Sequence, residues 1–248
     1  STGMLGGNRF LVSIEPWHGN ELVIYTRDGD PNGQWKRNVI DDQLTDGHAL
    51  ATGDLDQDGN DEIMAGYRMG DHSLYCYKCT DPEAVEWYKI AIDVGDMAAS
   101  GVDVADIDED GIPEIVIGCY DHYVYVLNGE NGSILWNYYA PYYIASPTSI
   151  ADLNNDDHLE IVFTSYNYLG VLSYTGGLLW SYTAGGGMFR GVSIADIDGN
   201  GILDVVFGSD DGVLRVLQGS NGSVVWTLDL EAHYQNTFQI DNAPVIED

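Results

Sequence analysis

Short apolar runs recur along the chain, and a polar loop separates them in pairs. Six-residue runs such as 48–53 (HALATG) and 190–195 (RGVSIA) precede these loops, and runs such as 62–67 (EIMAGY) and 204–209 (DVVFGS) follow them. Continuous apolar runs of this length indicate strands buried on both faces. No stretch shows a convincing helical period. The pattern therefore predicts an all-β chain.

Two further runs complete each unit. In one unit they are 123–129 (YVYVLNG) and 136–140 (WNYYA), joined by residues 129–133 (GENGS). The same connection occurs at 219–223 (GSNGS). Because Asn-Gly between two strands is a strong hairpin signal, each unit is predicted to be a meander of four antiparallel strands.

The units repeat with a regular period. Acidic motifs begin at Asp54, Asp106, Asp152 and Asp196, at intervals of 52, 46 and 44 residues. A second marker keeps the same phase, namely the tryptophans Trp35, Trp87, Trp136, Trp180 and Trp226. Four antiparallel strands in a repeat of this length are typical of one β-propeller blade.

We expect residues 1–8 to be a tag remnant or flexible N-terminus and residues 9–248 to form a single β-propeller domain. Its units start near residues 9, 48, 100, 146 and 190, and an extra strand follows at 242–247. In the first unit Glu15 takes the place of Asp54, and its loop lacks acids, so no metal is expected there. A five-bladed ring is the simplest closure. A slice of a longer propeller, or a ring completed by another chain, stays open.

The charge balance excludes some partners. Forty acidic residues against nine basic ones give a formal net charge of −31. Nucleic acid and anionic membranes are therefore poor partners, and no nucleic acid is expected to bind. No apolar run reaches the roughly 18 residues of a membrane-spanning helix, so no membrane insertion is expected. Cys76, Cys79 and Cys119 are too few for a zinc site, and free thiols or a strained local disulfide between the first two are expected.

The acidic loops have the spacing of a hard-cation site. Oxygen-bearing side chains stand at positions 1, 3, 5 and 9, and glycine stands at position 6 in three of the four loops; Asp157 replaces it in the fourth. Calcium takes six to eight oxygen ligands, including a carbonyl at position 7. The alternative, solvated acidic turns without metal, does not explain four copies of one spacing. About four Ca²⁺ ions of structural role are predicted, with these ligands: Asp54, Asp56, Asp58, Asn60, Glu62; Asp106, Asp108, Asp110, Ile112, Glu114; Asp152, Asn154, Asp156, His158, Glu160; Asp196, Asp198, Asn200, Ile202, Asp204.

An EF-hand is the obvious rival. It requires a bidentate acid at position 12 and flanking helices. Position 12 is apolar in all four loops and belongs to a predicted strand, with Ala65, Ile117, Phe163 and Phe207 at these places. A shorter strand–loop–strand site is therefore predicted.

D-x-D-x-D-G-x-x-[DE] between two strands, repeated about every 45 residues, resembles the FG-GAP/VCBS repeats of integrin α-subunits and of many bacterial and archaeal surface proteins. The resemblance covers nearly the whole chain. It implies a β-propeller, calcium in the loops and an extracellular or cell-surface location. It does not imply an activity, because such propellers host many functions.

Residues 15–20 (EPWHGN), 46–50 (DGHAL) and 66–68 (GYR) resemble the propeller part of aldos-2-ulose dehydratase-like sugar-active proteins. This resemblance covers about the first 70 residues. It implies that His18, His48 and Arg68 act as metal ligands or acid–base groups near the propeller axis. A histidine that removes a proton beside a carbonyl serves elimination chemistry.

A second set of residues follows from the repeat itself. His48 lies six residues before Asp54, and the same offset gives Ser100, Ser146, Arg190 and Asn242. These positions are expected to ring one mouth of a central channel and to bind a ligand. Tyr142 and Tyr143 are expected to add exposed rings that stack on sugars or bind a partner. The alternatives are satisfied rim residues and aromatic packing between blades.

The sequence thus favours an extracellular calcium-binding β-propeller that binds a glycan or a protein. The first alternative is a polysaccharide lyase or sugar dehydratase that uses histidines at the channel mouth. The second is a structural module or a fragment of a larger propeller, completed by further blades or as a homo-oligomer.

Overall fold

The computed structural model confirms the all-β prediction. It describes residues 1–15, 20–27, 33–44, 47–67, 73–82, 86–93, 101–234, 239–240 and 243–246, with the backbone alone for 48, 67 and 86–93. These residues form five four-stranded sheets and one short helix, α1 (Leu230–Tyr234). No helix among them is long and apolar enough to cross a membrane. The chain folds into two compact units, residues 1–121 with 125–135, and residues 122–124 with 136–248.

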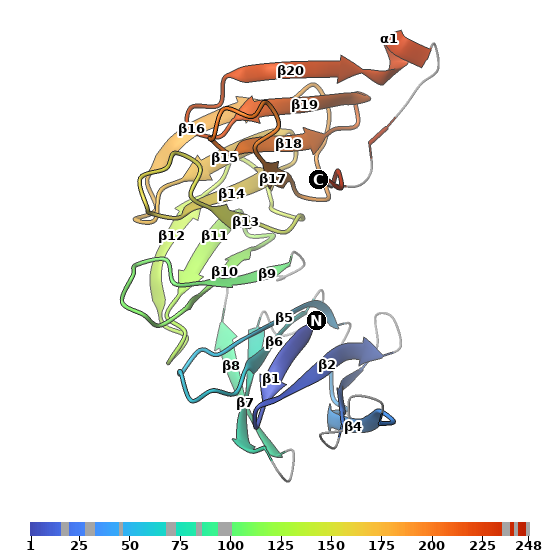
Figure 1. The fold of residues 1–248 in the computed structure, drawn as a ribbon, viewed down its shortest axis with the longest axis vertical. Coiled ribbons are helices and arrows are strands. Elements are labelled where there is room, and N and C mark those ends of the chain that lie inside the picture. The colour runs from blue at the N-terminus through green and yellow to red at the C-terminus, as the bar shows by residue number, and fades with distance from the viewer. Residues whose placement is uncertain are drawn as a thin grey trace. The chain divides into compact units, whose positions relative to one another are not determined.

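Each sheet is a meander in which neighbouring strands follow one another in the sequence (Figure 1). We number the sheets as blades 1 to 5, so that the predicted blade count and strand count are both confirmed. Blade 1 contains β1 (Thr2–Leu5), β2 (Asn8–Glu15), β3 (Glu21–Thr26) and β4 (Lys36–Asp41); blade 2 contains β5 (Gly47–Gly53), β6 (Glu62–Tyr67), β7 (Ser73–Asp81) and β8 (Glu86–Asp93); blade 3 contains β9 (Val102–Ala105), β10 (Glu114–Gly118), β11 (Tyr123–Leu127) and β12 (Ile134–Tyr139); blade 4 contains β13 (Ser149–Ala151), β14 (Glu160–Ser165), β15 (Tyr168–Leu172) and β16 (Leu178–Thr183); blade 5 contains β17 (Ser193–Ala195), β18 (Asp204–Gly208), β19 (Val213–Gln218) and β20 (Val224–Asp229).

Blade 1 begins one strand earlier in the sequence than expected. The segment 1–8, expected to be flexible, holds strand β1, whose Leu5 pairs with Asn8 of β2. Gly6 and Gly7 join the two strands with φ values of 53° and 77°, the conformation of a two-residue hairpin turn. The loop after Glu15 therefore joins the second and third strands, and the alignment of Glu15 with Asp54 is wrong. The Gly-Gly hairpin signal in the sequence was the missed clue.

The C-terminal segment also differs. Of the strand expected at 242–247, the described residues 243–246 are in no strand. Pro244 has no N–H to donate to a ladder, and its carbonyl instead accepts a hydrogen bond from Ser193 Oγ. Helix α1, which follows β20, was not predicted.

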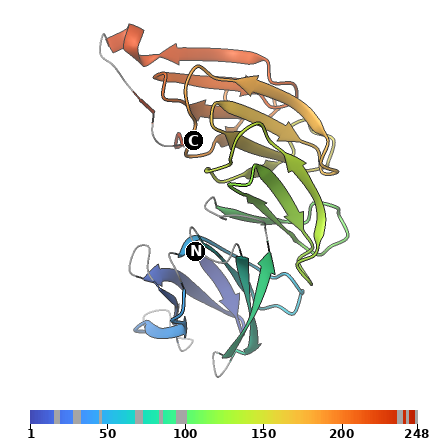
Figure 2. The ribbon, with the colours of Figure 1, turned by 180° about the vertical axis from the view of Figure 1, so that it is seen from behind.

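The core lies between the faces of successive blades. In the second unit, Val162 and Val171 of blade 4 pack against Val205 and Phe207 of blade 5, and Figure 2 shows the two sheets stacked in chain order. The residues of β10, β14 and β18 are all buried, because these second strands have a neighbour on both sides. The continuous apolar runs in the sequence reflect this burial.

The repeated tryptophans connect one blade to the next. Trp136 Nε1 on β12 donates to the Tyr174 carbonyl of blade 4 at 3.1 Å, and Trp180 Nε1 on β16 donates to the Gly219 carbonyl of blade 5 at 2.7 Å. The Trp180 ring also covers Gly222, where a Cβ would lie 2.5 Å from a ring atom. Since Gly222 has a φ of 71°, both the turn and the close approach require glycine. The side chain of Trp87 lies outside the described residues.

The hydrogen bond of Trp180 predicts that this tryptophan contributes more to the stability of the fold than Trp226 does. Trp226, the counterpart of Trp180 on β20, makes no such hydrogen bond in the described part of the chain. We expect Trp180→Phe to lower the free energy of unfolding by about 1 kcal/mol more than Trp226→Phe does. Urea denaturation of both variants measures this difference in the free energy of unfolding. Equal losses of stability would contradict a contribution from the hydrogen bond between Trp180 and blade 5.

Candidate functional site

The acidic loops join the first and second strands of blades 2 to 5 and share one hydrogen-bond pattern. The aspartate at position 1 accepts, through one carboxylate oxygen, the N–H of the residue at position 6. The N···O distances are 3.1 Å for Gly59 to Asp54, 3.1 Å for Gly111 to Asp106, 3.1 Å for Asp157 to Asp152 and 2.9 Å for Gly201 to Asp196. In the loops at 54 and 106 the other oxygen of this aspartate has no partner among the described residues. Asp152 Oδ1 and Asp196 Oδ1, in contrast, accept further backbone N–H groups of their own loops.

The turn at position 6 takes the left-handed conformation in every loop. Gly59, Gly111 and Gly201 have φ values of 86°, 92° and 87°, and Asp157 has a φ of 70°. Aspartate tolerates this conformation better than most residues other than glycine. The loop at 152 therefore keeps the shape of the other three even though it lacks the glycine.

The acid at position 9 is buried in each loop, at the first residue of the second strand. Glu62, Glu114, Glu160 and Asp204 each accept the N–H of the residue at position 2, at 2.8–2.9 Å. Burial raises the pKa of all four carboxyl groups, and it raises the pKa of Glu62 and Glu114 to about 7. A buried carboxylate is costly unless a positive charge or several hydrogen bonds compensate it.

Several oxygen atoms in these loops have no partner among the described residues. They are buried and belong to Asp54 (Oδ1), Asp106 (Oδ1), Glu114 (Oε1) and Asn154 (Oδ1). Orphaned acceptors of this kind are rare in folded proteins and indicate an ion or a water. Because three of the four belong to carboxylates, and carboxylate oxygens are ligands of hard cations, they fit a divalent cation better than a neutral donor.

Three of the four loops also gather carboxylates tightly. Oxygens of Asp54, Asp56 and Asp58 lie within 4.8 Å of one another, as do those of Asp106, Asp108 and Glu114, and those of Asp196, Asp198 and Asp204. The loop at 152 shows no such group within the described residues, and its position 3 is the neutral Asn154. In the loop at 54, Lys78 Nζ lies 3.6 Å from Asp56 Oδ2, so that loop already has one positive charge beside it.

The residues at position 7 were predicted to bind through their carbonyls. Their N–H groups donate to the side chain at position 5, at 2.7–3.0 Å, in the order Asn60, Ile112, His158 and Ile202. This hydrogen bond fixes the side chain at position 5. Coordination through the carbonyl stays a prediction.

The predicted channel rim is only partly described. His18, Arg68, Ser100 and Asn242 lie outside the described residues, as does the side chain of His48. Arg190 is exposed.

Ser146 does not fit the role of a rim ligand. Its side chain is fully buried, and its Oγ hydrogen-bonds the carbonyl of Thr164 at 3.2 Å and the Thr164 hydroxyl. It stabilises blade 4 and is not available to a ligand in this structure. The expectation that every residue six positions before the loop reaches the channel is wrong here, because this one points into the core.

Three aromatic side chains form an exposed row on blade 4 and its connections. Tyr142 is 46% exposed, Tyr166 is 43% exposed and Phe189 is 37% exposed. The ring centroids of Tyr142 and Tyr166 lie 5.6 Å apart, and those of Tyr166 and Phe189 lie 6.0 Å apart. We call these three residues the aromatic row. Of the predicted pair, Tyr142 belongs to the row and Tyr143 is half-buried.

Hydrogen bonds fix the segments that present the aromatic row. Ser165 Oγ accepts from the N–H of Tyr142 at 2.9 Å and donates to its carbonyl at 2.5 Å. The N–H of Met188 donates to the Tyr166 carbonyl at 2.8 Å. Tyr166 itself has a φ of 54°, an uncommon conformation for a bulky residue that surrounding contacts must maintain.

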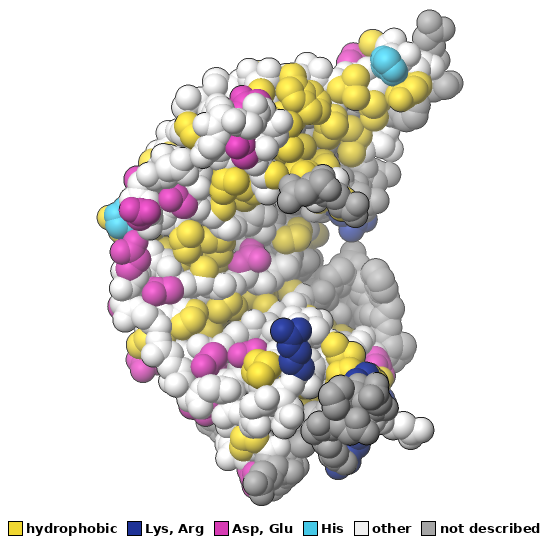
Figure 3. All heavy atoms as spheres, in the orientation of Figure 1, with side chains coloured by type: hydrophobic (Ala, Val, Ile, Leu, Met, Phe, Trp, Pro, Cys, Tyr) yellow, Lys and Arg dark blue, Asp and Glu magenta, His cyan; other side chains and the backbone are white. Residues whose placement is uncertain are grey.

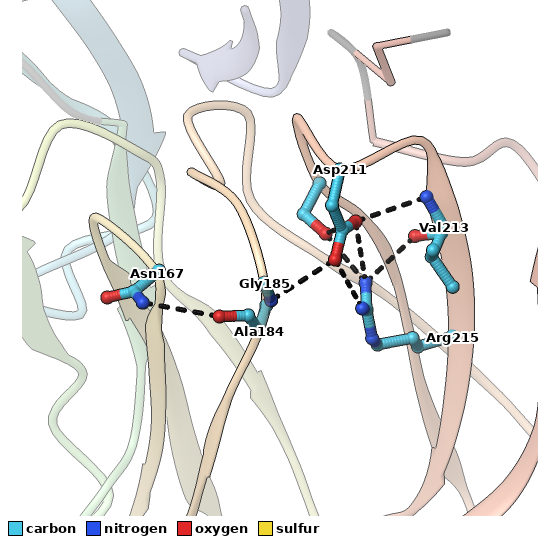
Figure 4. Close-up of polar contacts among 7 residues, drawn as sticks. Asn167, Ala184, Gly185, Asp211, Val213 and Arg215 are labelled. Atoms are coloured by element: carbon cyan, nitrogen blue, oxygen red, sulfur yellow. Dashed lines mark hydrogen bonds and ion pairs between the residues drawn. The ribbon is translucent and has the colours of Figure 1, made fainter. Parts of the chain in front are cut away.

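A polar network holds the connection that carries Phe189 (Figure 4). Asn167 Nδ2 donates to the Ala184 carbonyl at 3.2 Å, and the Gly185 N–H donates to Asp211 Oδ2 at 3.1 Å. Arg215 Nη1 lies 3.0 Å from Asp211 Oδ1, and this pairing helps to lower the pKa of Asp211 to about 2 although burial opposes it. The segments that carry the rings are therefore connected by hydrogen bonds to one another and to blade 5.

The row and the acidic loops lie at opposite ends of blade 4. In an antiparallel meander, the connection from the first to the second strand and the connection from the second to the third lie at opposite ends. The acidic loop at 152 is the former and Tyr166 lies in the latter. A cation in the loop and a ligand on the row would thus not touch one another.

Cys76, Cys79 and Cys119 form no disulfide in the structure. Cys76 and Cys79 stand three residues apart on β7, so their side chains point to opposite faces of the sheet. This geometry excludes the local disulfide that we considered.

Together, the five meanders and the repeated loops define a β-propeller-type repeat protein. The model of the FG-GAP-like repeat matches residues 152–207, which include the acidic loops of blades 4 and 5. No curated protein matches the chain in sequence.

Solved structures share the fold. The chain is similar to the V. cholerae biofilm matrix protein Bap1 (TM-score 0.64, 19% identity, 91% of this chain and 36% of that one). It is also similar to Saccharomyces cerevisiae Sqt1 (TM-score 0.66, 16% identity, 91% and 61%) and to BBS1N in complex with ARL6DN (TM-score 0.61, 16% identity, 91% and 63%). At these identities the likeness shows the fold alone. The chain spans about a third to two thirds of the length of these proteins. The resemblance to aldos-2-ulose dehydratase-like proteins stays a prediction.

Proposed function

We propose that this chain is an extracellular or cell-surface β-propeller module that is stabilised by calcium and binds a neutral glycan through the aromatic row. The observation that carries the proposal of binding is the row of three exposed rings in contact with one another, on segments fixed by hydrogen bonds. Exposed apolar patches on soluble proteins mark interaction sites when they are contiguous. The match to the FG-GAP-like repeat supports the calcium and the location.

Calcium is supported by the chemistry of the loops. Each loop supplies several carboxylate or amide oxygens at flexible angles, as Ca²⁺ requires, and no imidazole or thiolate from the predicted ligand set. Four bound ions would change the formal net charge from −31 to −23. The ion would relieve repulsion within each loop and compensate the buried acid at position 9. Its role would be structural, because it fixes the turn into a buried strand.

A neutral glycan is favoured by charge and by ring chemistry. The acidic surface of the chain repels anionic polymers. Tyrosine and phenylalanine offer apolar faces to the C–H groups of a sugar, and the tyrosine hydroxyls offer hydrogen bonds to its hydroxyl groups. A protein partner is the alternative outcome of the experiment below.

The lyase or dehydratase alternative rests on His18, His48 and Arg68. Their side chains lie outside the described residues, so nothing in the described geometry supports a catalytic base. We propose binding because the residues that support it, those of the aromatic row, are among the described ones.

Calcium and protons are expected to compete for the loops. Since the pKa of Glu62 and Glu114 in the folded state, about 7, lies above the ordinary value of 4.5, the metal-free fold takes up protons that the unfolded chain does not. Its stability therefore rises as the pH falls from 8 to 5. At pH 8, calcium at 100 times its Kd adds about 2.7 kcal/mol per site, or at least about 5 °C in Tm for one site. At pH 5 the calcium-dependent gain in Tm is smaller, because protons compete with Ca²⁺ for the carboxylates of the loops. Calorimetry with Ca²⁺ and with EDTA measures both effects.

Two variants serve as a matched pair. Glu114→Gln removes a buried acid of a loop. It should therefore reduce the calcium-dependent gain in Tm at pH 8 by the amount that one site contributes. Glu130→Gln changes an exposed residue of a hairpin turn and should leave the gain unchanged. An identical Tm with Ca²⁺ and EDTA at pH 8 would refute the calcium proposal.

The aromatic row is tested with a glycan array in saturating calcium. We expect binding to neutral glycans, weakened about fivefold by Tyr166→Ala, because stacking on one ring is worth about 1 kcal/mol. Tyr234→Ala changes a tyrosine that is similarly exposed but lies on α1, outside the row, and should bind as the wild type does. Array binding that survives Tyr166→Ala, or no binding at all, contradicts the glycan assignment; capture of a protein that is lost in Tyr166→Ala would assign the row to a protein partner.

A further inference from the structure

The acidic loops of blades 4 and 5 are joined by a direct hydrogen bond. Asn155 stands at position 4 of the loop at 152, and its Nδ2 donates to the carbonyl of Gly201, at position 6 of the loop at 196, at 2.9 Å. Both loops belong to the second compact unit. Figure 3 shows Asp and Glu side chains gathered over the left side of blades 4 and 5 in this view. The hydrogen bond therefore connects two candidate calcium sites.

This connection includes the aspartate at position 1 of each loop. The backbone N–H of Asn155 donates to Asp152 Oδ1 at 2.7 Å. In the other loop, the backbone N–H of Gly201 donates to Asp196 Oδ2 at 2.9 Å. Both aspartates are predicted calcium ligands. A chain of hydrogen bonds through Asn155 and Gly201 thus runs from one of these ligands to the other.

Position 4 has an uncommon backbone conformation in every loop. Gln57, Glu109 and Asn155 have φ values of 58°, 62° and 60°, and Gly199 has a φ of 73°. A positive φ is uncommon for a residue with a side chain, and asparagine tolerates it better than most. Three of the four loops therefore keep a side chain at a position where glycine would fit the backbone more easily.

The first compact unit repeats the arrangement. Gln57, at position 4 of the loop at 54, lies beside Gly111, at position 6 of the loop at 106. A Cβ on Gly111 would lie 3.6 Å from Gln57 Nε2. In both units, position 4 of one loop thus contacts position 6 of the next, so the contact belongs to the repeat and not to one side chain alone.

A buried contact sets the spacing of the loops at 152 and 196. Leu153, at position 2, is buried, and its N–H donates to Glu160 Oε2 at 2.8 Å. Leu153 packs on Gly219, where a Cβ would lie 3.1 Å from it. The N–H of Gly219 donates to the Leu203 carbonyl of the next loop at 3.0 Å. Packing in the core therefore holds the two loops side by side, and Asn155 bridges their exposed parts.

Both loops carry a sign of a ligand besides this bridge. In the loop at 152, Asn154 Oδ1 is buried and has no partner among the described residues. In the loop at 196, oxygens of Asp196, Asp198 and Asp204 lie within 4.8 Å of one another, and Asp204 is fully buried. The predicted ligands at positions 5 and 7 flank position 6. An ion in the loop at 196 would therefore fix the turn at Gly201.

We propose that Asn155 couples the loops at 152 and 196, so that Ca²⁺ bound in one loop raises the affinity of the other loop for Ca²⁺. This inference rests on the calcium binding proposed above. An ion in the loop at 196 fixes the Gly201 carbonyl, which holds the Asn155 amide, and the Asn155 N–H then holds Asp152. By linkage, the effect is equal in both directions. Asn155 is a positioning residue, since it is not among the predicted ligands.

Repulsion between the ions acts in the opposite sense. A filled loop is less negative than an empty one and therefore attracts the next cation less. Because Asp156, Asp196 and Asp198 are exposed, salt at about 0.15 M screens their interactions beyond about 8 Å. At this salt concentration we expect the hydrogen-bonded connection to outweigh the repulsion.

A calcium titration followed by two-dimensional NMR of the amide groups tests the coupling, because every loop has amide signals of its own. His158 reports the filling of the loop at 152, and Gly201 reports that of the loop at 196. Asp198→Ala removes one of three gathered carboxylates and should leave the loop at 196 empty while the loop at 152 fills. We expect this variant to raise the calcium midpoint of the loop at 152 about fivefold, at the lower end of typical coupling.

Asn155→Gly tests the route of the coupling. Glycine removes the side-chain amide, keeps the N–H that Asp152 accepts, and suits the left-handed conformation as Gly199 does. In this background, Asp198→Ala should change the midpoint of the loop at 152 by less than about twofold, the limit for independent sites. A general loss of stability would not remove the response to Asp198→Ala. Gln57→Gly makes the matching change in the loop at 54 and should leave the fivefold response intact.

Three results would contradict these expectations in distinguishable ways. If the midpoint of the loop at 152 does not respond to Asp198→Ala, the two loops are independent, although calcium binding itself stands. If the fivefold response persists in Asn155→Gly, the role of Asn155 is wrong. If no amide of the four loops shifts with Ca²⁺, the proposed calcium binding fails and this inference fails with it. The amide spectrum of each variant also shows that its fold is retained.

Discussion

A buried acid at the ninth position of each loop is the constraint on which the blades depend. Glu62, Glu114, Glu160 and Asp204 each open a buried second strand and, at the same time, hold the N–H at the start of their own loop. The same acidic side chain therefore requires charge compensation in the loop and takes part in the burial of the strand. The aspartate at position 1 and the left-handed turn at position 6 complete a frame with orphaned oxygens, which is the arrangement that a hard cation satisfies.

The second constraint is that no blade covers its own faces. Trp136 and Trp180 reach backbone carbonyls of the next blade, and the glycines of its hairpin turns make room for their rings. Stability in such a repeat is carried by the contacts between neighbours as much as by each sheet.

The sequence predicted much of this architecture because periodicity reports burial. Continuous apolar runs gave the strands, and the spacing of the acids gave the loops and their ligand positions. Blade 1 was misaligned because its apolar residues fit either phase, and only the Gly6–Gly7 turn decides between them. Ser146 shows a further limit, since an offset in a repeat fixes where a residue lies along the chain but not where its side chain points. Tyr166 and Phe189 were missed because they lie in connections without a period, and only the fold brings them beside Tyr142.

The most direct test of the account is a count of bound calcium. Equilibrium dialysis of the metal-free protein against Ca²⁺ at pH 8, followed by elemental analysis, gives the number of ions per chain. The account predicts close to four, one for each acidic loop, with the loop at 152 the last to fill because, among the described residues, it is the one of the four that brings no three carboxylates together. A count below one ion per chain, at calcium concentrations in the millimolar range typical of weak extracellular sites, would contradict it.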